Sequence, residues 1–188
     1  MRTQGINHLA LVCRDMAETQ RFYTEVLDMP LVKTVALADG GQHFFFDCGG
    51  GSLLAFFWWP DVTEGAPGVA SVEHFPSKPK TVVGSMNHVA FTVDEAQLED
   101  YCARLEAAGV PVLPVVVNHD DSELGVAREP HAGVFVRSVY FTDPNGVMLE
   151  FAALTRPLGA PGDTRHAAAT RVRGGAGDQE RALAVNCD

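Results

Sequence analysis

The sequence has few cysteines, and none of them forms a recognisable pair. The chain of 188 residues contains four, at Cys13, Cys48, Cys102 and Cys187, with no CxxC motif and no close spacing. Cys13 and Cys48 fall in strand-like segments and Cys102 in a helix-like one. Because free cysteine behaves as a small apolar side chain, buried free thiols are the expected state of these residues.

Basic residues and long apolar runs are also scarce. The 14 Lys and Arg are outnumbered by 24 Asp and Glu, giving a formal charge of −10, which argues against a nucleic-acid or anionic-membrane partner. No apolar run approaches the roughly 20 residues that a membrane-spanning helix needs. The opening "MRTQGINHLA" enters a strand at once and leaves no room for a signal peptide, so a cytoplasmic protein is expected.

The sequence does contain an internal repeat. The segment "INHLALVC" (Ile6–Cys13) is matched by "MNHVAFTV" (Met86–Val93), and "GSLLAFF" (Gly51–Phe57) is matched by "GVMLEFA" (Gly146–Ala152). Overlaying the copies pairs one histidine with another and one alanine with a carboxylate. The paired positions are His8 with His88 and Ala55 with Glu150.

Three of these four positions carry metal-ligating side chains. A lone histidine in a strand, such as His8, is usually a core residue, but its recurrence at His88 in register with a carboxylate favours ligation by all three. Glu150 lies between two apolar residues, where an unpaired carboxylate would be costly to bury and coordination would remove that cost. Two histidines and one carboxylate are typical of a mononuclear iron site with open coordination positions.

Each half of the chain predicts a β-α-β-β-β order. In the first half, Asp15 is the expected N-cap of a helix. The predicted elements there are strands at Ile6–Cys13, Leu31–Leu37, Gln42–Cys48 and Ser52–Trp58 and a helix at Met16–Leu27. In the second half they are strands at Met86–Val93, Val112–Val117, Val134–Thr142 and Val147–Ala152 and a helix at Glu95–Ala108, ending at Gly109.

These elements predict a single domain over residues 1–154, followed by a disordered tail. The two modules occupy about residues 5–58 and 86–154, with a proline-rich linker at 59–85. The tail, residues 155–188, turns to Gly, Ala, Pro and Arg. Residues 118–133 are expected to form a long polar loop, in which the cluster from His119 to Glu123 is solvated or serves as a lid. His43 is expected to be structural.

With its two histidine-bearing modules and the closing "DPNGVMLEF", the segment Gly5–Leu154 resembles the vicinal oxygen chelate superfamily, which includes glyoxalase I, fosfomycin-resistance proteins and type I extradiol dioxygenases. The resemblance implies an α+β fold in which two tandem βαβββ modules form an open, U-shaped β-barrel around a metal site. The implied ligands are His8, His88 and Glu150. Ala55 stands where glyoxalase I normally supplies a fourth ligand.

Within that superfamily the second half is similar to the extradiol dioxygenases. Their pattern is a histidine, seven residues, an aliphatic-Tyr pair, Asp-Pro-x-Gly and Glu. It is matched here by His131, Val139, Tyr140, Asp143, Pro144, Gly146 and Glu150. Glu129 departs from the pattern, which has a small or β-branched residue two before the histidine. The acid-base histidine of these enzymes, about fourteen residues before the second metal histidine, corresponds to His74.

The resemblance implies a mononuclear non-haem Fe(II) dioxygenase that cleaves a small aromatic diol with O2. His74 would be the acid-base group, and His131 and Tyr140 would hydrogen-bond the substrate oxygens. Expected apolar walls for the ring are Phe91, Phe135 and the pair Trp58–Trp59, of which only one can face inward. A homo-oligomer is possible.

Two alternatives remain open. Another metalloenzyme of the same fold, a glyoxalase-like lyase or a Mn(II) transferase that opens an epoxide in an antibiotic, would share the three ligands but would not need His131 and Tyr140. A metal-free antibiotic-binding protein is the second alternative, and the complete ligand triad argues against it.

Overall fold

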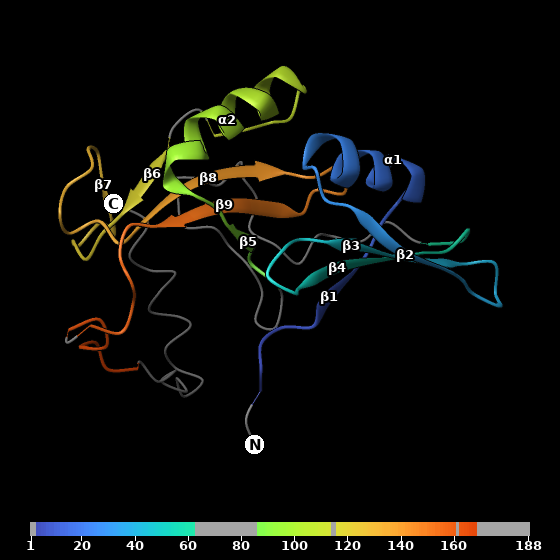
Figure 1. Ribbon diagram of the computed structural model, residues 1–188, viewed down its shortest axis with the longest axis horizontal. Helices are drawn as coiled ribbons and strands as arrows, with labels where there is room; N and C mark the ends of the chain where they lie inside the picture. Colours follow the sequence, from blue (N-terminus) through green and yellow to red (C-terminus); the bar gives the residue numbers. More distant parts are fainter. Residues whose placement is uncertain (1–2, 63–85, 114–115, 161, 169–188) are drawn as a thin grey trace, which may run out of the picture. The chain divides into compact units, whose positions relative to one another are not determined.

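The computed structural model describes residues 3–62, 86–113, 116–160 and 162–168 (Figure 1). The chain divides into two compact units, Met1–Arg156 and Pro157–Asp188. The prediction of a disordered tail concerns residues that lie mostly outside the described ranges. Within those ranges, no helix is long and apolar enough to cross a membrane.

The first half of the larger unit forms a four-stranded mixed sheet with the order β1-β4-β3-β2 (Figure 1). Its outer strand β1 runs parallel to β4, and the other neighbours are antiparallel. Its strands are β1 (His8–Val12), β2 (Leu31–Ala36), β3 (Gln42–Asp47) and β4 (Leu53–Trp58).

The second half repeats this plan in a five-stranded sheet with the order β5-β9-β8-β6-β7. Here β5 runs parallel to β9, and the other pairs are antiparallel. Its strands are β5 (Val89–Thr92), β6 (Val117–His119), β7 (Val126–Ala127), β8 (Val136–Thr142) and β9 (Met148–Leu154). The α+β class is confirmed, and the described residues form two separate sheets instead of one closed barrel.

The helices begin and end where the sequence predicts. α1 (Met16–Arg21) continues into a π-helical turn, η1 (Phe22–Val26), and the Asp15 carboxylate accepts a 2.8 Å hydrogen bond from the amide of Glu18. A 3₁₀ turn, η3 (Glu95–Gln97), leads into α2 (Leu98–Ala107). Gly109 follows α2 with φ of 73°, the left-handed conformation that ends many helices.

The described part of one predicted strand differs from the prediction, and residues 114–115 of that strand lie outside the described ranges. In place of a strand at Val112–Val117, the described residues contain an isolated bridge between Val112 and Phe141 and then β6, which begins at Val117. Pro111 precedes this stretch and Pro114 lies within it, and because proline has no amide hydrogen it cannot donate to a sheet. The segment 118–133, which was predicted to be a loop, contains most of β6 and all of β7.

The strand register confirms the overlay of the two halves. Ala10 pairs with Ala55 in the first sheet, and Ala90 pairs with Glu150 in the second. Each alanine partner lies two residues after the histidine of its module, so His8 shares a face with Ala55 and His88 with Glu150. A slip of one residue would have placed these side chains on opposite faces.

The other face of each sheet carries the hydrophobic core beneath the helices. Tyr23, Phe46, Phe56, Leu98 and Phe141 are among its fully buried side chains. Cys13 is also buried, which agrees with the expected free thiols. The opposite face of each sheet, which the helix of that module leaves uncovered, carries the residues that the repeat singles out. We call it the uncovered face.

The turn of the "DPNG" motif joins the two halves. Asp143 accepts hydrogen bonds from the amides of Asn145 and Val147, at 2.9 and 2.8 Å, and from the buried hydroxyl of Tyr23 in the first module, at 3.1 Å. The Asn145 side chain accepts a bond from the Arg14 amide, 2.9 Å away. This motif therefore has a structural role, which explains why it indicates the fold and not the reaction.

Candidate metal centre

A cluster of polar side chains lies on the face of the second sheet that faces away from α2. The β8–β9 register opposes Tyr140 to Glu150 and Ser138 to Ala152, so these polar residues share one face. His119 of β6 opposes Val136, which lies on the same face. His88 completes the cluster just before β5.

The centre of the cluster is the contact between His88 and Glu150. The His88 Nε2 lies 2.8 Å from Glu150 Oε2, and the Ser138 hydroxyl donates to Glu150 Oε1 at 2.5 Å. Two donor atoms that bind one ion at right angles, each about 2.1 Å from it, lie about 3 Å apart. The observed separation fits two neighbouring ligands of a single divalent ion.

An asparagine orients each repeat histidine. The Nδ1 of His88 lies 2.6 Å from Asn87 Oδ1, and the Nδ1 of His8 lies 2.8 Å from Asn7 Oδ1. Because an amide oxygen only accepts, each Nδ1 carries a hydrogen, and Nε2, which in His88 points at Glu150, is the nitrogen that would bind a metal in place of a hydrogen. Hydrogen bonds of this kind commonly fix the ring of a metal-binding histidine. The repeated "NH" dipeptide is the sequence signal for it.

The carboxylate of Glu150 suits a cation. The residue is 5% exposed. Burial alone would raise the pKa of Glu150, but the hydrogen bonds from His88 and Ser138 outweigh that effect and the pKa lies below its ordinary value. Glu150 is therefore ionised near neutral pH, and a buried carboxylate beside a histidine is an electrostatic fit to a divalent metal.

Sequence reasoning missed His119. Its Nε2 lies 3.1 Å from the hydroxyl of Tyr140, whose ring stands edge-on to His88 with centroids 5.8 Å apart. Burial lowers the pKa of His119, although Glu150 opposes this effect. The residue was expected in a solvated loop because β6 begins later than predicted. In the structure it is a half-buried neighbour of Tyr140.

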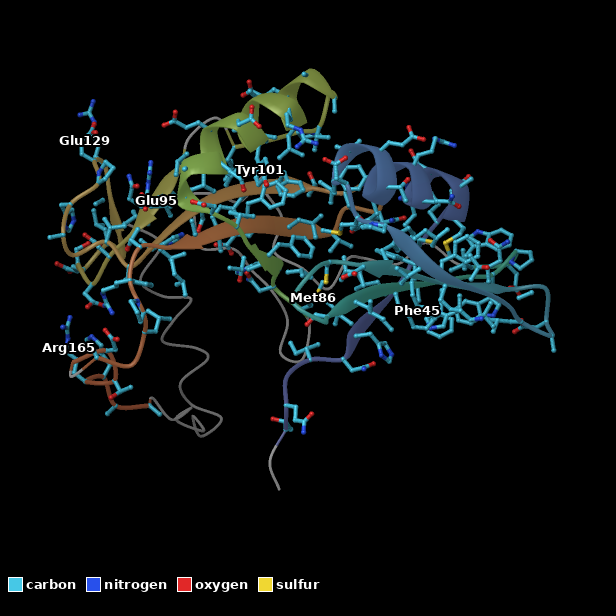
Figure 2. The ribbon with its side chains drawn as sticks, viewed as in Figure 1. Phe45, Met86, Glu95, Tyr101, Glu129 and Arg165 are labelled. Atoms are coloured by element: carbon cyan, nitrogen blue, oxygen red, sulfur yellow. The ribbon has the colours of Figure 1, made fainter. Side chains whose placement is uncertain are left out.

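The third proposed ligand, His8, lies on the uncovered face of the first sheet. It is exposed, and its ring packs edge-on against Phe45, which projects away from α1 (Figure 2). Phe45 occupies the place in the first module that Tyr140 holds in the second. Among the described residues, no group of three His, Cys, Asp or Glu side chains is arranged to hold a metal ion. The ligand triad therefore stays a prediction, with two of its members in contact.

The other predicted site residues have different surroundings. His131 Nε2 lies 3.1 Å from Asp120 Oδ2, and its Nδ1 accepts the amide of Gly133. The structure thus gives Tyr140 a histidine neighbour in His119, and the role of His131 stays a prediction. His74 lies outside the described residues.

Two expectations about apolar walls are settled by the register. Phe91 opposes Phe151, on the face opposite Glu150, so its assignment as a wall of the metal centre is wrong. Trp58 packs against the core while Trp59 stacks on Phe57 on the uncovered face, which confirms that only one of the pair can face inward.

Comparison with known families agrees with this arrangement. The model of the Glyoxalase/Bleomycin resistance protein/Dioxygenase superfamily matches residues 5–151. The chain belongs to this superfamily. The match includes both repeat histidines and Glu150, the residues that the two sheets place on their uncovered faces.

Two curated relatives have different activities in their names. The chain is 29% identical to the metallothiol transferase FosB of Shouchella clausii (strain KSM-K16) over 147 residues, 78% of this chain and 77% of that protein. It is 33% identical to the putative ring-cleaving dioxygenase MhqE of Bacillus subtilis (strain 168) over 115 residues, 58% of this chain and 33% of that protein. The second match spans only a third of the dioxygenase.

Solved structures support the fold. A glyoxalase family protein from Enterococcus faecalis gives a TM-score of 0.55 at 23% identity, covering 79% of this chain and 97% of that one. The fosfomycin resistance protein FosX of Listeria monocytogenes, complexed with Mn(II) and sulfate, gives 0.53 at 18% identity, covering 82% and 95%. At these identities the likeness shows the fold alone.

Proposed function

We propose that this protein is a mononuclear Fe(II) dioxygenase that cleaves the ring of a small aromatic diol with O2, using His8, His88 and Glu150 as ligands. The observation that carries the proposal is the contact of His88 with Glu150, with the Tyr140–His119 pair beside it. Two imidazoles and one carboxylate leave coordination positions open for a substrate.

The uncovered face of the first sheet supports an aromatic substrate. The rings of His43 and Phe57 are stacked, with centroids 3.6 Å apart and planes at 5°, and Trp59 stacks on Phe57 at 5.3 Å. Phe45 packs edge-on against both His43 and His8. All these rings share the face of His8, so a flat apolar ring bound near His8 would meet aromatic side chains.

The Tyr140–His119 pair supplies the polar part of the site. Burial raises the pKa of Tyr140, so its hydroxyl keeps its hydrogen and can donate to a substrate oxygen. The lowered pKa of His119 leaves its ring neutral near pH 7, able to accept a proton through Tyr140. We propose that these two residues orient the diol and relay its proton, with His131 and His74 as further acid-base candidates.

The residues present fit the proposed metal, and Mn(II) would fit the same donors. When bound, Fe(II) supplies the electron chemistry that allows O2 to react with an electron-rich ring. The chain's own contribution is to present one imidazole on the first sheet and one imidazole beside a carboxylate on the second, to fix the imidazole rings through Asn7 and Asn87, and to keep Glu150 ionised.

A second copy of the chain is the proposed source of the missing ligand. His8 is exposed on the first sheet, the His88 side chain is 32% exposed on the second, and each lies on a face that its own helix leaves uncovered. If the first sheet of one copy faces the second sheet of another, His8 completes the ligand set. This arrangement makes a homodimer with two equivalent sites.

A Mn(II) transferase acting on a phosphonate is the rival function, and the FosB match favours it by its longer coverage. A FosX structure holds Mn(II) with 1S,2S-dihydroxypropylphosphonic acid, and phosphonates are anions that proteins bind with Arg and Lys. Among the described strand residues, Lys33 is the one cation that the register places on the uncovered faces. This low positive charge supports a neutral aromatic substrate.

The test is anaerobic purification with metal analysis, followed by a panel of catechols and hydroquinones. We expect about one iron per chain and O2-dependent formation of a coloured ring-fission product. Formation of a thiol adduct of fosfomycin with Mn(II), together with no O2 uptake on any diol, would replace the dioxygenase by the transferase.

A further inference from the structure

We propose that His43 binds the end of the substrate ring that lies away from the metal, where its Nε2 accepts a hydrogen bond from a hydroxyl or amino group. This inference rests on the proposed function and deepens it, because it names the substrate as a diol whose ring carries a further hydrogen-bond donor. The sequence predicted only a structural role for His43. The position, the tautomer and the packing of its imidazole favour a role in binding.

His43 lies on the uncovered face of the first sheet, which also carries His8. It opposes Phe57, four residues along β4 from the partner of His8, and an even spacing keeps both on one face. Phe45 opposes Ala55, midway between these two positions. Its ring centroid lies 5.7 Å from that of His8 and 4.2 Å from that of His43. A substrate ring that lies over Phe45 with one end at a metal on His8 would therefore have its other end at His43.

The tautomer of His43 leaves one ring nitrogen as an acceptor. Its Nδ1 lies 3.1 Å from the backbone oxygen of Phe56, and because a carbonyl oxygen only accepts, Nδ1 carries a hydrogen. In the neutral ring Nε2 then has a lone pair, and within the described part of the chain no group donates to it. The residue is half-buried, so a ligand can reach it. A ligand that donates a hydrogen bond would match this nitrogen.

Aromatic packing holds the His43 imidazole in place before a ligand binds. Phe57 stacks on it with centroids 3.6 Å apart, and Trp59 stacks on Phe57. Trp59 is itself fixed, because its indole nitrogen donates to Asp39 at 2.9 Å and because a side chain at Gly41 would come within 2.6 Å of its ring. A ring that is already ordered loses little entropy on binding, so a single hydrogen bond to it can discriminate between ligands.

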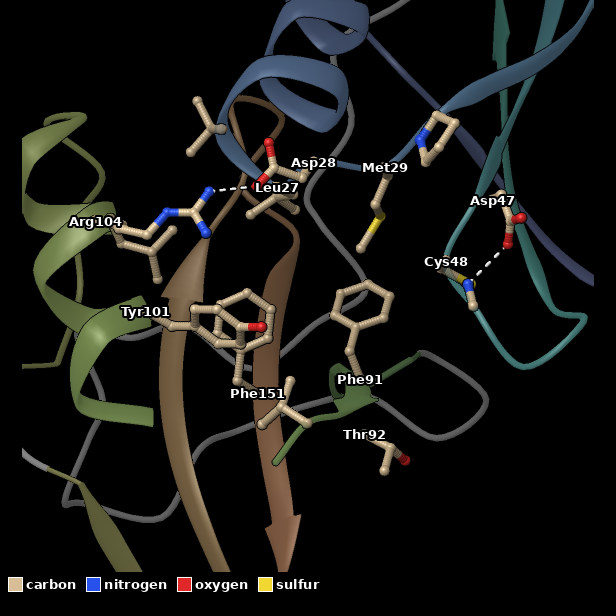
Figure 3. A pocket seen from close by; sticks show the side chains of 15 residues that line it. Leu27, Asp28, Met29, Asp47, Cys48, Phe91, Thr92, Tyr101, Arg104 and Phe151 are labelled. Atoms are coloured by element: carbon tan, nitrogen blue, oxygen red, sulfur yellow. Dashed lines mark hydrogen bonds and ion pairs between the residues drawn. The ribbon is translucent and has the colours of Figure 1, made fainter. Parts of the chain in front are cut away.

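A cavity between the two modules is the other place where a ring could bind. It has a volume of about 390 Å³ and lies on the side of the second sheet opposite to Glu150, where Phe91 and Phe151 contribute to its lining (Figure 3). Its charged side chains Arg104 and Asp28 are paired with each other (Figure 3). Among the described residues that line it, none is a proposed metal ligand. The amides around it therefore report any ligand that binds there instead of on the first sheet.

Three catechols that differ in one substituent test the proposal: 4-(hydroxymethyl)catechol, 4-ethylcatechol and 3,4-dihydroxybenzoate. Each is titrated without O2 into the full chain loaded with Zn(II), which binds imidazole and carboxylate but has no redox chemistry. Binding is followed by calorimetry and by amide shifts in NMR spectra. We expect the hydroxymethyl compound to bind about 5-fold more tightly than the ethyl compound, the usual order for one neutral hydrogen bond. The carboxylate of the third compound cannot donate to Nε2, so we expect it to bind most weakly.

One variant and a matched control separate the hydrogen bond from the stacking. His43→Phe keeps a flat ring against Phe57 but removes the acceptor, so it should reverse the preference in favour of the ethyl compound. His166→Phe makes the same substitution in the smaller unit and should leave the preference unchanged. Long-range ¹H–¹⁵N spectra give a second readout. The Nε2 signal of His43 should shift when the hydroxymethyl compound binds and stay in place with the ethyl compound.

The outcomes distinguish this inference from the proposed function. If none of the catechols binds to the Zn(II)-loaded chain, the proposed function fails and this inference fails with it. If they bind with equal affinity, or if His43→Phe keeps the preference for the hydroxymethyl compound, only this inference is overturned. Tightest binding by 3,4-dihydroxybenzoate, or amide shifts centred on Val93 and Tyr101 at the cavity, would overturn it as well.

Discussion

Single residues carry most of the chemistry proposed for this chain, and Tyr140 is the one best placed to act on a substrate. Its hydroxyl bonds His119 at 3.1 Å, and its ring packs edge-on against His88. Tyr140→Phe removes one hydrogen bond and leaves the metal ligands in place. We expect turnover of a diol to fall about 10-fold, with unchanged iron content in metal analysis of the purified variant.

A matched change separates this effect from a general loss of packing. Tyr101→Phe removes an exposed hydroxyl that bonds Gln97 at 2.9 Å, away from the ligands. It should leave turnover unaltered. Equal losses in the two variants would mean that the Tyr140 hydroxyl has no direct part in the reaction.

His119 gives the chain a stability that depends on pH. Burial lowers its pKa in the folded state, so the unfolded chain takes up the proton first as the pH falls. The contribution is therefore present above the unfolded value, about 6.5, and is lost as the pH falls below it. His119→Gln removes the titrating group, so chemical unfolding should show a smaller change in stability between pH 7.5 and 5.5. An unchanged pH dependence would show that His119 titrates as freely as in the unfolded chain.

The sequence predicted the candidate site residues that the internal repeat marks, but it did not predict His119, which lies outside the repeat pattern. His8, His88 and Glu150 stand out because the repeat places them at matching points of two copies. His119 has no counterpart that ligates, and its strand follows a stretch interrupted by proline, so its position depended on where β6 begins. Its contact with Tyr140 is a tertiary feature that spacing does not encode.

At the scale of the strands, the register explains why the two modules differ in function. Ala55 holds in the first sheet the position of Glu150 in the second, and it is fully buried. Ala55→Glu should add a fourth ligand, keep the metal and lower O2-dependent turnover. Ala55→Val adds bulk without a ligand and is the control. Metal analysis and O2 uptake distinguish the two. Loss of metal in Ala55→Glu alone would contradict the equivalence of the two positions.

Strands and helices were also the part of the structure that the sequence predicted best. The N-cap at Asp15 and the left-handed Gly109 mark the ends of the helices, because capping is a local property of a few residues. Of the described residues in the strand predicted at Val112–Val117, only Val117 belongs to a strand of the structure, β6; the apolar residues suggested a ladder to which Pro114 has no amide hydrogen to donate. Alternation along β4 correctly assigned Trp58 and Trp59 to opposite faces.

At the scale of the whole molecule, the two modules are held together by buried hydrogen bonds. The Tyr23 hydroxyl donates to Asp143, whose carboxyl has a raised pKa because of burial. Tyr23→Phe removes this bond, and we expect the free energy of unfolding to fall by about 1 kcal/mol. Tyr101→Phe, which loses an exposed bond, should cost less in the same denaturation experiment. An equal loss of unfolding free energy in the two variants would mean that the Tyr23–Asp143 hydrogen bond does not stabilise the contact between the modules.

The assembly of the metal centre is the feature that sequence patterns did not predict. The repeat named the three ligands, but it carries no information on whether one chain or two supplies them. In the described residues His88 meets Glu150, while His8 contacts Asn7 and Phe45. A second copy of the chain is the proposed solution, since each sheet leaves one face uncovered.

The most direct test is metal analysis of a mixed dimer. One chain carries His8→Ala and the other Glu150→Ala, each with its own tag, and the heterodimer is isolated by two successive affinity steps. If each site takes His8 from one copy and His88 with Glu150 from the other, one of the two sites is intact. The account predicts one iron per heterodimer and none in either mutant homodimer. No iron in the heterodimer, with two in the unaltered dimer, would contradict it.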